Sequence, residues 1–212
     1  MPFRSFVALA TFFILTTVRV ADIATTLHFD PSLSREGNPF VHFIGGKAPA
    51  LVTSSTVVWL TCVVLLYFFL RGESLKLVQS PERLGKFVRL WLDRVIRTRR
   101  PIKDTLPKGP HWNDGLQGVR LFGLALPWSM IFSSVSAVHS WFAIQQTSQR
   151  TAYRQLYASL QVNKLNYLPW LWAIPGSVFG VILFFCSEYR EVRSKWFAQN
   201  RQDRNEPLPD RH

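Results

Sequence analysis

Residues 50–70 limit what this chain can fold into more than any other stretch, because they include no charged side chain. The stretch reads ALVTSSTVVWLTCVVLLYFFL. An α-helix rises 1.5 Å per residue, so about 20 apolar residues cross the roughly 30 Å hydrocarbon core of a bilayer. The stretch therefore predicts a transmembrane helix over about residues 49–71.

Two later stretches repeat this pattern, and one at the N-terminus approaches it. The later runs predict transmembrane helices over about residues 118–144 and 167–188. The N-terminal apolar run that ends at Arg19 is too short to span a bilayer. It becomes long enough if the helix covers about residues 5–27, where Arg19 and Asp22 are three residues apart and can pair on one helix face.

A cleaved signal peptide is the alternative interpretation of the N-terminal run, since a basic start before an apolar core has that general form. Cleavage requires small residues at positions −1 and −3. Cutting after Ala21 puts Arg19 at −3, and cutting after Ala24 puts Asp22 there. We therefore predict that the run is retained, and that the chain is an all-α integral membrane protein with four transmembrane helices.

The 25 Lys and Arg residues are distributed unevenly between the loops. Residues 71–117 hold eleven and the tail, residues 190–212, holds six, whereas the 28–48 and 145–166 loops hold two and three. Positive residues are retained on the cytoplasmic side, so we expect a membrane domain over residues 1–189 with both termini inside and the two charge-poor loops outside. A bacterial inner membrane is the expected location. Orientation signals and anionic lipid headgroups account for the net charge of +12, so no nucleic-acid partner is expected.

Within the basic inner segment, residues 81–99 predict an amphipathic helix. Ser80 and Pro81 are typical of a helix start, and apolar residues then recur at helical spacing. We expect this cytoplasmic helix to lie along the lipid surface, or to pack its apolar face on the underside of the bundle or on a partner. The basic residues expected at the lipid surface are Lys86, Arg89, Arg94 and Arg97.

Polar residues collect between the first two predicted helices, in residues 22–42. Ionisable groups at the edge of an apolar slab are costly to keep there, so their concentration points to a structural or a functional role. The candidate residues of this polar corner are Asp22, Thr26, His28, Asp30, Glu36, Asn38 and His42.

Asp22 and Thr26 form an Asp-x-x-x-Thr element, and the run from Glu36 to Pro39 forms a Glu-x-Asn-Pro element. With these two elements, residues 5–70 resemble an uncharacterised family of small bacterial multi-pass membrane proteins. The resemblance implies a membrane hairpin with a polar corner, and it implies no known activity. The rest of the chain shows no such resemblance.

Two interpretations of the polar corner stay open. In the structural one, Asn38 and Pro39 form a turn, and Glu36 accepts hydrogen bonds from exposed backbone donors. Asp22 then pairs with Arg19 or caps a neighbouring helix. In the functional one, the carboxylates and imidazoles bind Zn²⁺ or Mn²⁺ or transfer protons. The spacing matches no recognised metal motif, so we assign no metal ligand and no catalytic residue, and the cofactor is unknown.

His139 lies among small residues of the third predicted helix. Serines and an alanine four residues apart allow another helix to approach closely and offer hydroxyl partners to the imidazole. A hydrogen-bonded histidine in a helix interface is therefore the favoured interpretation of His139. The alternatives are an axial ligand of a haem or another tetrapyrrole, and a catalytic base.

Together these observations favour a non-catalytic interaction or assembly subunit of a larger membrane protein complex, in contact with lipids and with other membrane subunits. No complete catalytic constellation is present. The alternatives are a metal-dependent membrane enzyme that uses Asp22 and Glu36, and a pigment- or haem-associated subunit that uses His139. A small transporter is disfavoured because the four helices show no internal repeat.

Overall fold

The computed structural model of this chain contains five α-helices and one small β-hairpin in its described part. The described residues are 3–33, 41, 43, 45, 47–74, 83–97, 111–146, 161–162, 165–166 and 168–205. The elements are α1 (Phe3–Phe29), α3 (Ala48–Arg71), α4 (Leu84–Arg97), α5 (His111–Gln146), β1 (Gln161–Val162), β2 (Leu165–Asn166) and α7 (Leu168–Asn205).

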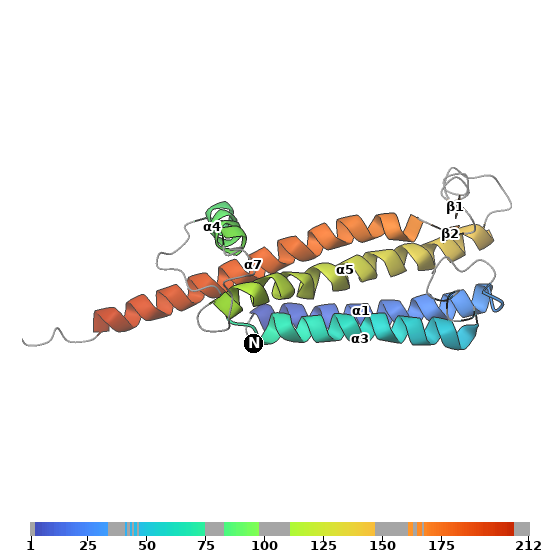
Figure 1. The fold of residues 1–212 in the computed structure, drawn as a ribbon, viewed down its shortest axis with the longest axis horizontal. Helices are drawn as coiled ribbons and strands as arrows, with labels where there is room; N and C mark the ends of the chain where they lie inside the picture. Colours follow the sequence, from blue (N-terminus) through green and yellow to red (C-terminus); the bar gives the residue numbers. More distant parts are fainter. Residues whose placement is uncertain are drawn as a thin grey trace, which may run out of the picture.

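Helices α1, α3, α5 and α7 lie lengthwise beside one another in an antiparallel bundle (Figure 1). The start of α1, the end of α3 and the start of α5 meet at the end of the bundle where α4 crosses α7. We refer to this as the α4 end. The antiparallel pair β1 and β2 lies at the opposite end, which we refer to as the hairpin end.

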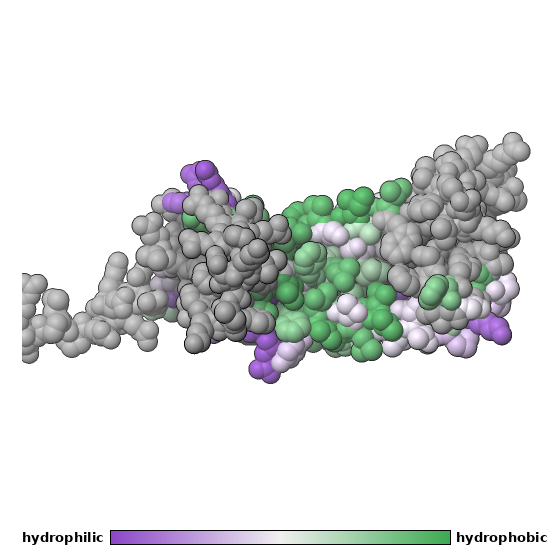
Figure 2. All heavy atoms as spheres, viewed as in Figure 1, coloured by the Kyte–Doolittle hydropathy of each residue, from purple (hydrophilic) through white to green (hydrophobic). Residues whose placement is uncertain are grey.

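All four long helices are long and apolar enough to cross a membrane. The candidate spans are Phe3–Phe29, Ala48–Arg71, Leu116–Phe142 and Leu171–Ala198. Figure 2 shows a hydrophobic band across the middle of the visible face of the bundle, with hydrophilic surface toward both ends. The prediction of an all-α, four-helix, multi-pass membrane protein is therefore confirmed.

The predicted end of the fourth helix at residue 188 is wrong, because α7 continues to Asn205. The charged residues that suggested a tail lie on a helix whose inner face still packs on the bundle. Val192 is buried in the same apolar cluster as Phe184 and Trp91. Likewise α5 begins at His111 rather than at residue 118.

The amphipathic helix α4 (Leu84–Arg97) lies within the predicted range of residues 81–99. Its apolar side faces the bundle, where the Trp91 ring lies 5.6 Å from that of Phe184 and 5.2 Å from that of Phe185. Phe87 packs at 6.0 Å on Tyr189. Of the alternatives for this face, the structure therefore supports packing on the bundle.

The basic residues of α4 are described only in part. Lys86 and Arg89 are exposed. The side chains of Arg94 and Arg97 lie outside the described residues, as do any contacts they make. A lipid-surface role for these four residues stays a prediction.

Close contact between α5 and α7 depends on two glycines spaced four residues apart. A Cβ atom on Gly176 would lie 2.4 Å from the carbonyl oxygen of Trp128, and one on Gly180 would lie 2.5 Å from that of Leu124. Neither distance is compatible with a larger side chain unless the helices separate. Residues 176–180 thus form a GxxxG motif, the pattern that lets membrane helices approach backbone to backbone.

Candidate functional site

A buried polar site of the described bundle is centred on Glu188, which is fully buried at the α4 end. Its Oε1 atom accepts a hydrogen bond of 2.5 Å from Nη2 of Arg4 on α1. The same oxygen accepts a second bond from Nη2 of Arg120 on α5. One carboxylate of α7 therefore joins the beginning of α1 to α5.

The two arginines also hold the end of α3. Arg4 donates from Nη1 to the carbonyl oxygen of Gly72 at 2.7 Å, and Arg120 donates from Nη1 to that of Glu73. Positive groups are favourable at a helix C-terminus, where the last carbonyls have no partner within the helix. A Cβ atom on Gly72 would lie 2.2 Å from Cδ of Arg120, so glycine leaves room for the arginine side chain.

Glu191, one turn further along α7, completes the set. Its Oε2 atom lies 2.7 Å from Nη2 of Arg4, and its Oε1 atom lies 2.8 Å from Nζ of Lys195. We refer to Arg4, Arg120, Glu188 and Glu191 as the charge network. Its two positive and two negative groups balance, and they join all four long helices.

The two arginines of the charge network are enclosed by protein. Arg4 and Arg120 are 7% and 1% exposed, and both point their guanidinium groups at protein oxygens. A buried ion pair of this kind is costly to break because the remaining charge loses its partner in a medium of low dielectric constant. The arrangement is that of a structural clamp, in which Oε1 of Glu188 binds both arginines while its Oε2 is buried without a hydrogen-bond partner among the described residues.

A second polar site lies further along α1, toward the hairpin end. Nη1 of Arg19 donates to Oδ2 of Asp22 at 2.8 Å and lies 2.9 Å from Oγ of Ser134. The Ser134 hydroxyl in turn donates to Oδ2 of Asp22 at 2.9 Å. The structure therefore contains the predicted pairing of Arg19 with Asp22, and it adds a partner from α5 that the sequence did not indicate.

Tryptophans also attach α1 to its neighbours by donating their indole N–H groups to threonine hydroxyls. These bonds measure 3.0–3.2 Å and occur at three depths in the bundle. The pairs are Trp128 with Thr11, Trp59 with Thr16, and Trp141 with Thr26. Thr26 of the polar corner is thus buried as an acceptor between α1 and α5.

The described members of the polar corner do not converge on a common ligand site. His28 is exposed, with its ring 4.8 Å from that of Phe29. Asp30 is buried and accepts a bond of 2.8 Å from Ser32. Among the residues that the structure describes, no group of three or more His, Cys, Asp or Glu side chains could hold a metal ion.

The remaining corner residues, Glu36, Asn38 and His42, lie outside the described residues. Their predicted roles as turn formers or ligands are therefore still predictions. For Asp22 and Thr26, the contacts given above match the structural interpretation of the corner.

His139 is exposed on α5, whereas the neighbouring serines 133, 134, 136 and 140 are buried. The small-residue face therefore packs inside the bundle, and the predicted role of His139 as a hydrogen-bonded histidine in a helix interface stays a prediction. A cofactor on His139 stays an untested alternative.

The sequence interpretation missed the charge network. Arg4, Arg120 and Glu188 each stand at the edge of an apolar run, so they marked where the predicted spans begin or end. The available signal was that these charges all belong to helix ends predicted on the same side of the membrane.

Comparisons with protein-family models, with known proteins and with solved structures find no match to this chain. The resemblance of residues 5–70 to a family of small bacterial multi-pass proteins therefore stays a prediction.

Proposed function

We propose that this chain is a non-catalytic interaction or assembly subunit of a larger membrane protein complex. The observation that carries the proposal is that charged groups within the spans of the described bundle serve contacts inside the bundle. Arg19 and Asp22 pair with each other, and Glu188 pairs with two arginines. Polar groups used in this way stabilise the bundle itself, so contacts with other proteins would be made by its outer faces.

The outward face of α3 supports this proposal. Its exposed residues recur at helical spacing and are mostly β-branched and small toward the hairpin end. The hydroxyls of Thr56 and Thr61 donate to carbonyl oxygens of their own helix at 2.8 and 2.9 Å, so they present no unmet hydrogen bond. Such a face allows another membrane helix to pack closely. We refer to residues 53, 56, 57, 60, 61 and 64 as the α3 outer stripe.

The location that fits this role is a bacterial inner membrane with the α4 end in the cytoplasm. The proposal follows from the excess of Lys and Arg in residues 71–117 and 190–212. Single cysteines at the exposed Ser32 and Arg83 should react with membrane-impermeant reagents from opposite sides, in a background lacking Cys62 and Cys186. Reaction of both from the same side contradicts the orientation.

The subunit proposal is tested by a matched pair of valine variants. Val57 on the α3 outer stripe and Val178 on α7 are 57% and 55% exposed, so either position tolerates tryptophan in lipid. We expect wild-type protein and Val178→Trp, solubilised in mild detergent from the native membrane, to retain membrane partners in a fixed ratio. Val57→Trp should lose them, because the larger ring keeps the partner helix away.

Two results contradict the proposal. One is a wild-type protein that is purified from native membrane alone, without partners in a fixed ratio. The other is an equal loss of partners in both variants, which would indicate a nonspecific effect of tryptophan.

A further inference from the structure

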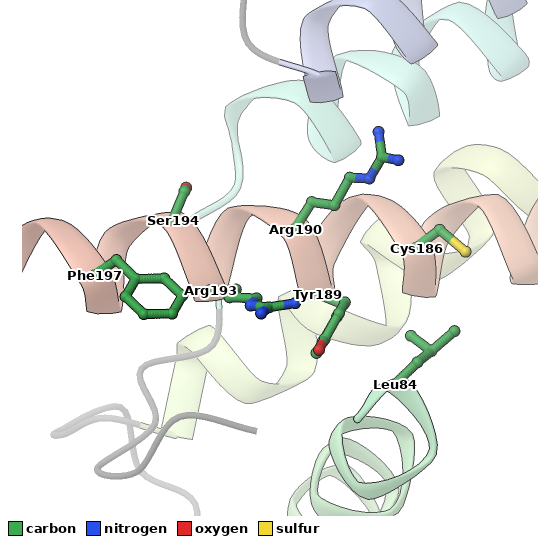
Figure 3. A pocket seen from close by; sticks show the side chains of 7 residues that line it. All are labelled: Leu84, Cys186, Tyr189, Arg190, Arg193, Ser194 and Phe197. Carbon is green, nitrogen blue, oxygen red and sulfur yellow. The ribbon is translucent and has the colours of Figure 1, made fainter. Parts of the chain in front are cut away.

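An open groove of about 500 Å³ lies between α4 and α7, outside the charge network. Figure 3 shows the groove with Leu84 on the α4 side and the other lining residues on α7. The lining residues are Leu84, Cys186, Tyr189, Arg190, Arg193, Ser194 and Phe197. The groove is thus apolar toward Cys186 and carries positive charge toward the end of α7.

Arg193 is oriented by two aromatic rings. Its guanidinium carbon lies 6.0 Å from the ring centre of Tyr189 and 5.6 Å from that of Phe197. A cation over a ring face is held by the ring quadrupole, and the in-plane N–H groups of arginine remain able to bind an oxyanion. Within the ranges that the structure describes, no carboxylate forms an ion pair with Arg193.

Arg190 offers a contrast on the same helix. Its guanidinium carbon lies 4.3 Å from the ring centre of Phe3, and Figure 3 shows the side chain directed away from Leu84. Only the stem of Arg190 therefore contributes to the groove, while Arg193 supplies the charge beside Tyr189 and Phe197.

The outer face of α7 continues the groove into the hydrophobic band. Ile174, Val178 and Ile182 are 63%, 55% and 52% exposed and are spaced four residues apart, in register with Cys186. At 1.5 Å per residue, Ile182 lies about 16 Å along the helix from Arg193. That length is close to the thickness of one leaflet, about half of the roughly 30 Å hydrocarbon core.

We propose that this groove binds one anionic phospholipid, with its phosphate on Arg193 and an acyl chain along α7 past Cys186 toward Ile182. The charge complementarity and the apolar row of matching length identify this occupant. Arginine forms forked, charge-assisted hydrogen bonds to phosphate, and lipids of net negative charge are attracted most strongly by basic surface at the membrane edge. This proposal does not depend on the subunit proposal above.

The test compares Arg193→Gln with Arg190→Gln in purified protein titrated with phosphatidylglycerol or phosphatidylcholine, and bound lipid is counted by native mass spectrometry. We expect wild-type protein and Arg190→Gln to bind phosphatidylglycerol at least about tenfold more tightly than phosphatidylcholine, a preference worth about 1.4 kcal/mol. Arg193→Gln should lose that preference.

Three outcomes overturn the proposal. Equal affinity of the wild-type protein for the two lipids removes the headgroup selectivity. If both arginine variants lose the preference for phosphatidylglycerol equally, the lipid is attracted by the general positive charge of α7 rather than by a site on Arg193. Competition by soluble glycerol phosphate as strong as that by the whole lipid shows that the groove takes a free anion and that the acyl chain plays no part.

Discussion

Replacing Glu188 by glutamine should destabilise the bundle more than any other single change of comparable size. Glutamine keeps the volume of the side chain, and its carbonyl oxygen still accepts one arginine hydrogen bond. The negative charge is lost, however, while Arg4 and Arg120 stay buried with only the partly exposed Glu191 to balance them. The charge network then carries an excess positive charge between four helices.

The expected loss is about 3–5 kcal/mol in the free energy of unfolding, the range found when one partner of a buried ion pair is removed. Glu191→Gln is the matched control on the same helix. Glu191 is 24% exposed, so solvent screens its pairs with Arg4 and with the 64% exposed Lys195, and Arg4 keeps Glu188 as a partner when Glu191 is replaced. Replacing Glu191 should cost about 1 kcal/mol or less.

Reversible unfolding in mixed micelles of mild detergent and dodecyl sulphate, followed by circular dichroism, measures these free energies. The double variant Glu188→Gln/Arg120→Gln removes one charge of each sign and should be more stable than the sum of the single losses indicates, by about 0.5–3 kcal/mol. The reasoning is refuted if Glu188→Gln costs no more than Glu191→Gln, or if the two single losses simply add.

Three further predictions follow from the helix contacts. Gly180→Val should separate α5 from α7, because its Cβ would lie 2.5 Å from the carbonyl oxygen of Leu124. Disulfide crosslinking of engineered cysteine pairs across these two helices should then become at least several-fold slower. An unchanged crosslinking rate contradicts the close packing. Trp141→Phe should cost about 0.6–1.5 kcal/mol in the micelle unfolding assay by removing the hydrogen bond to Thr26; no loss would mean that this bond is not stabilising. Asp22→Asn leaves Arg19 without a counter-charge, so it should lower the free energy of unfolding without changing the metal content of the protein. Metal that is bound to the wild-type protein and lost in this variant would restore the metal-enzyme alternative.

The predicted helices agreed with the structure where hydrophobicity and length decide the outcome. All four spans were identified. Three of them are runs of about 20 apolar residues, and the first is long enough because α1 continues through Arg19 and Asp22, which pair with each other. The end of α7 was missed by 17 residues, from 188 to 205. Charged residues normally mark the end of a transmembrane span. Here Glu188 and Glu191 pair with Arg4 and Val192 is buried, so the helix continues past them.

The polar corner was predicted in part. Arg19 and Asp22 are three residues apart on one helix, so their pairing follows from local geometry. The contribution of Ser134, 112 residues away from Asp22, depends on which face α5 turns toward α1.

By itself, the sequence determined that this chain has four helices long and apolar enough to cross a membrane, because length and hydrophobicity are local properties. Only the tertiary structure decided that Glu188 binds Arg4 from 184 residues away, and that α4 packs on α7. A buried charge must find a partner once it leaves water, and the partner available is set by helix packing rather than by distance along the chain.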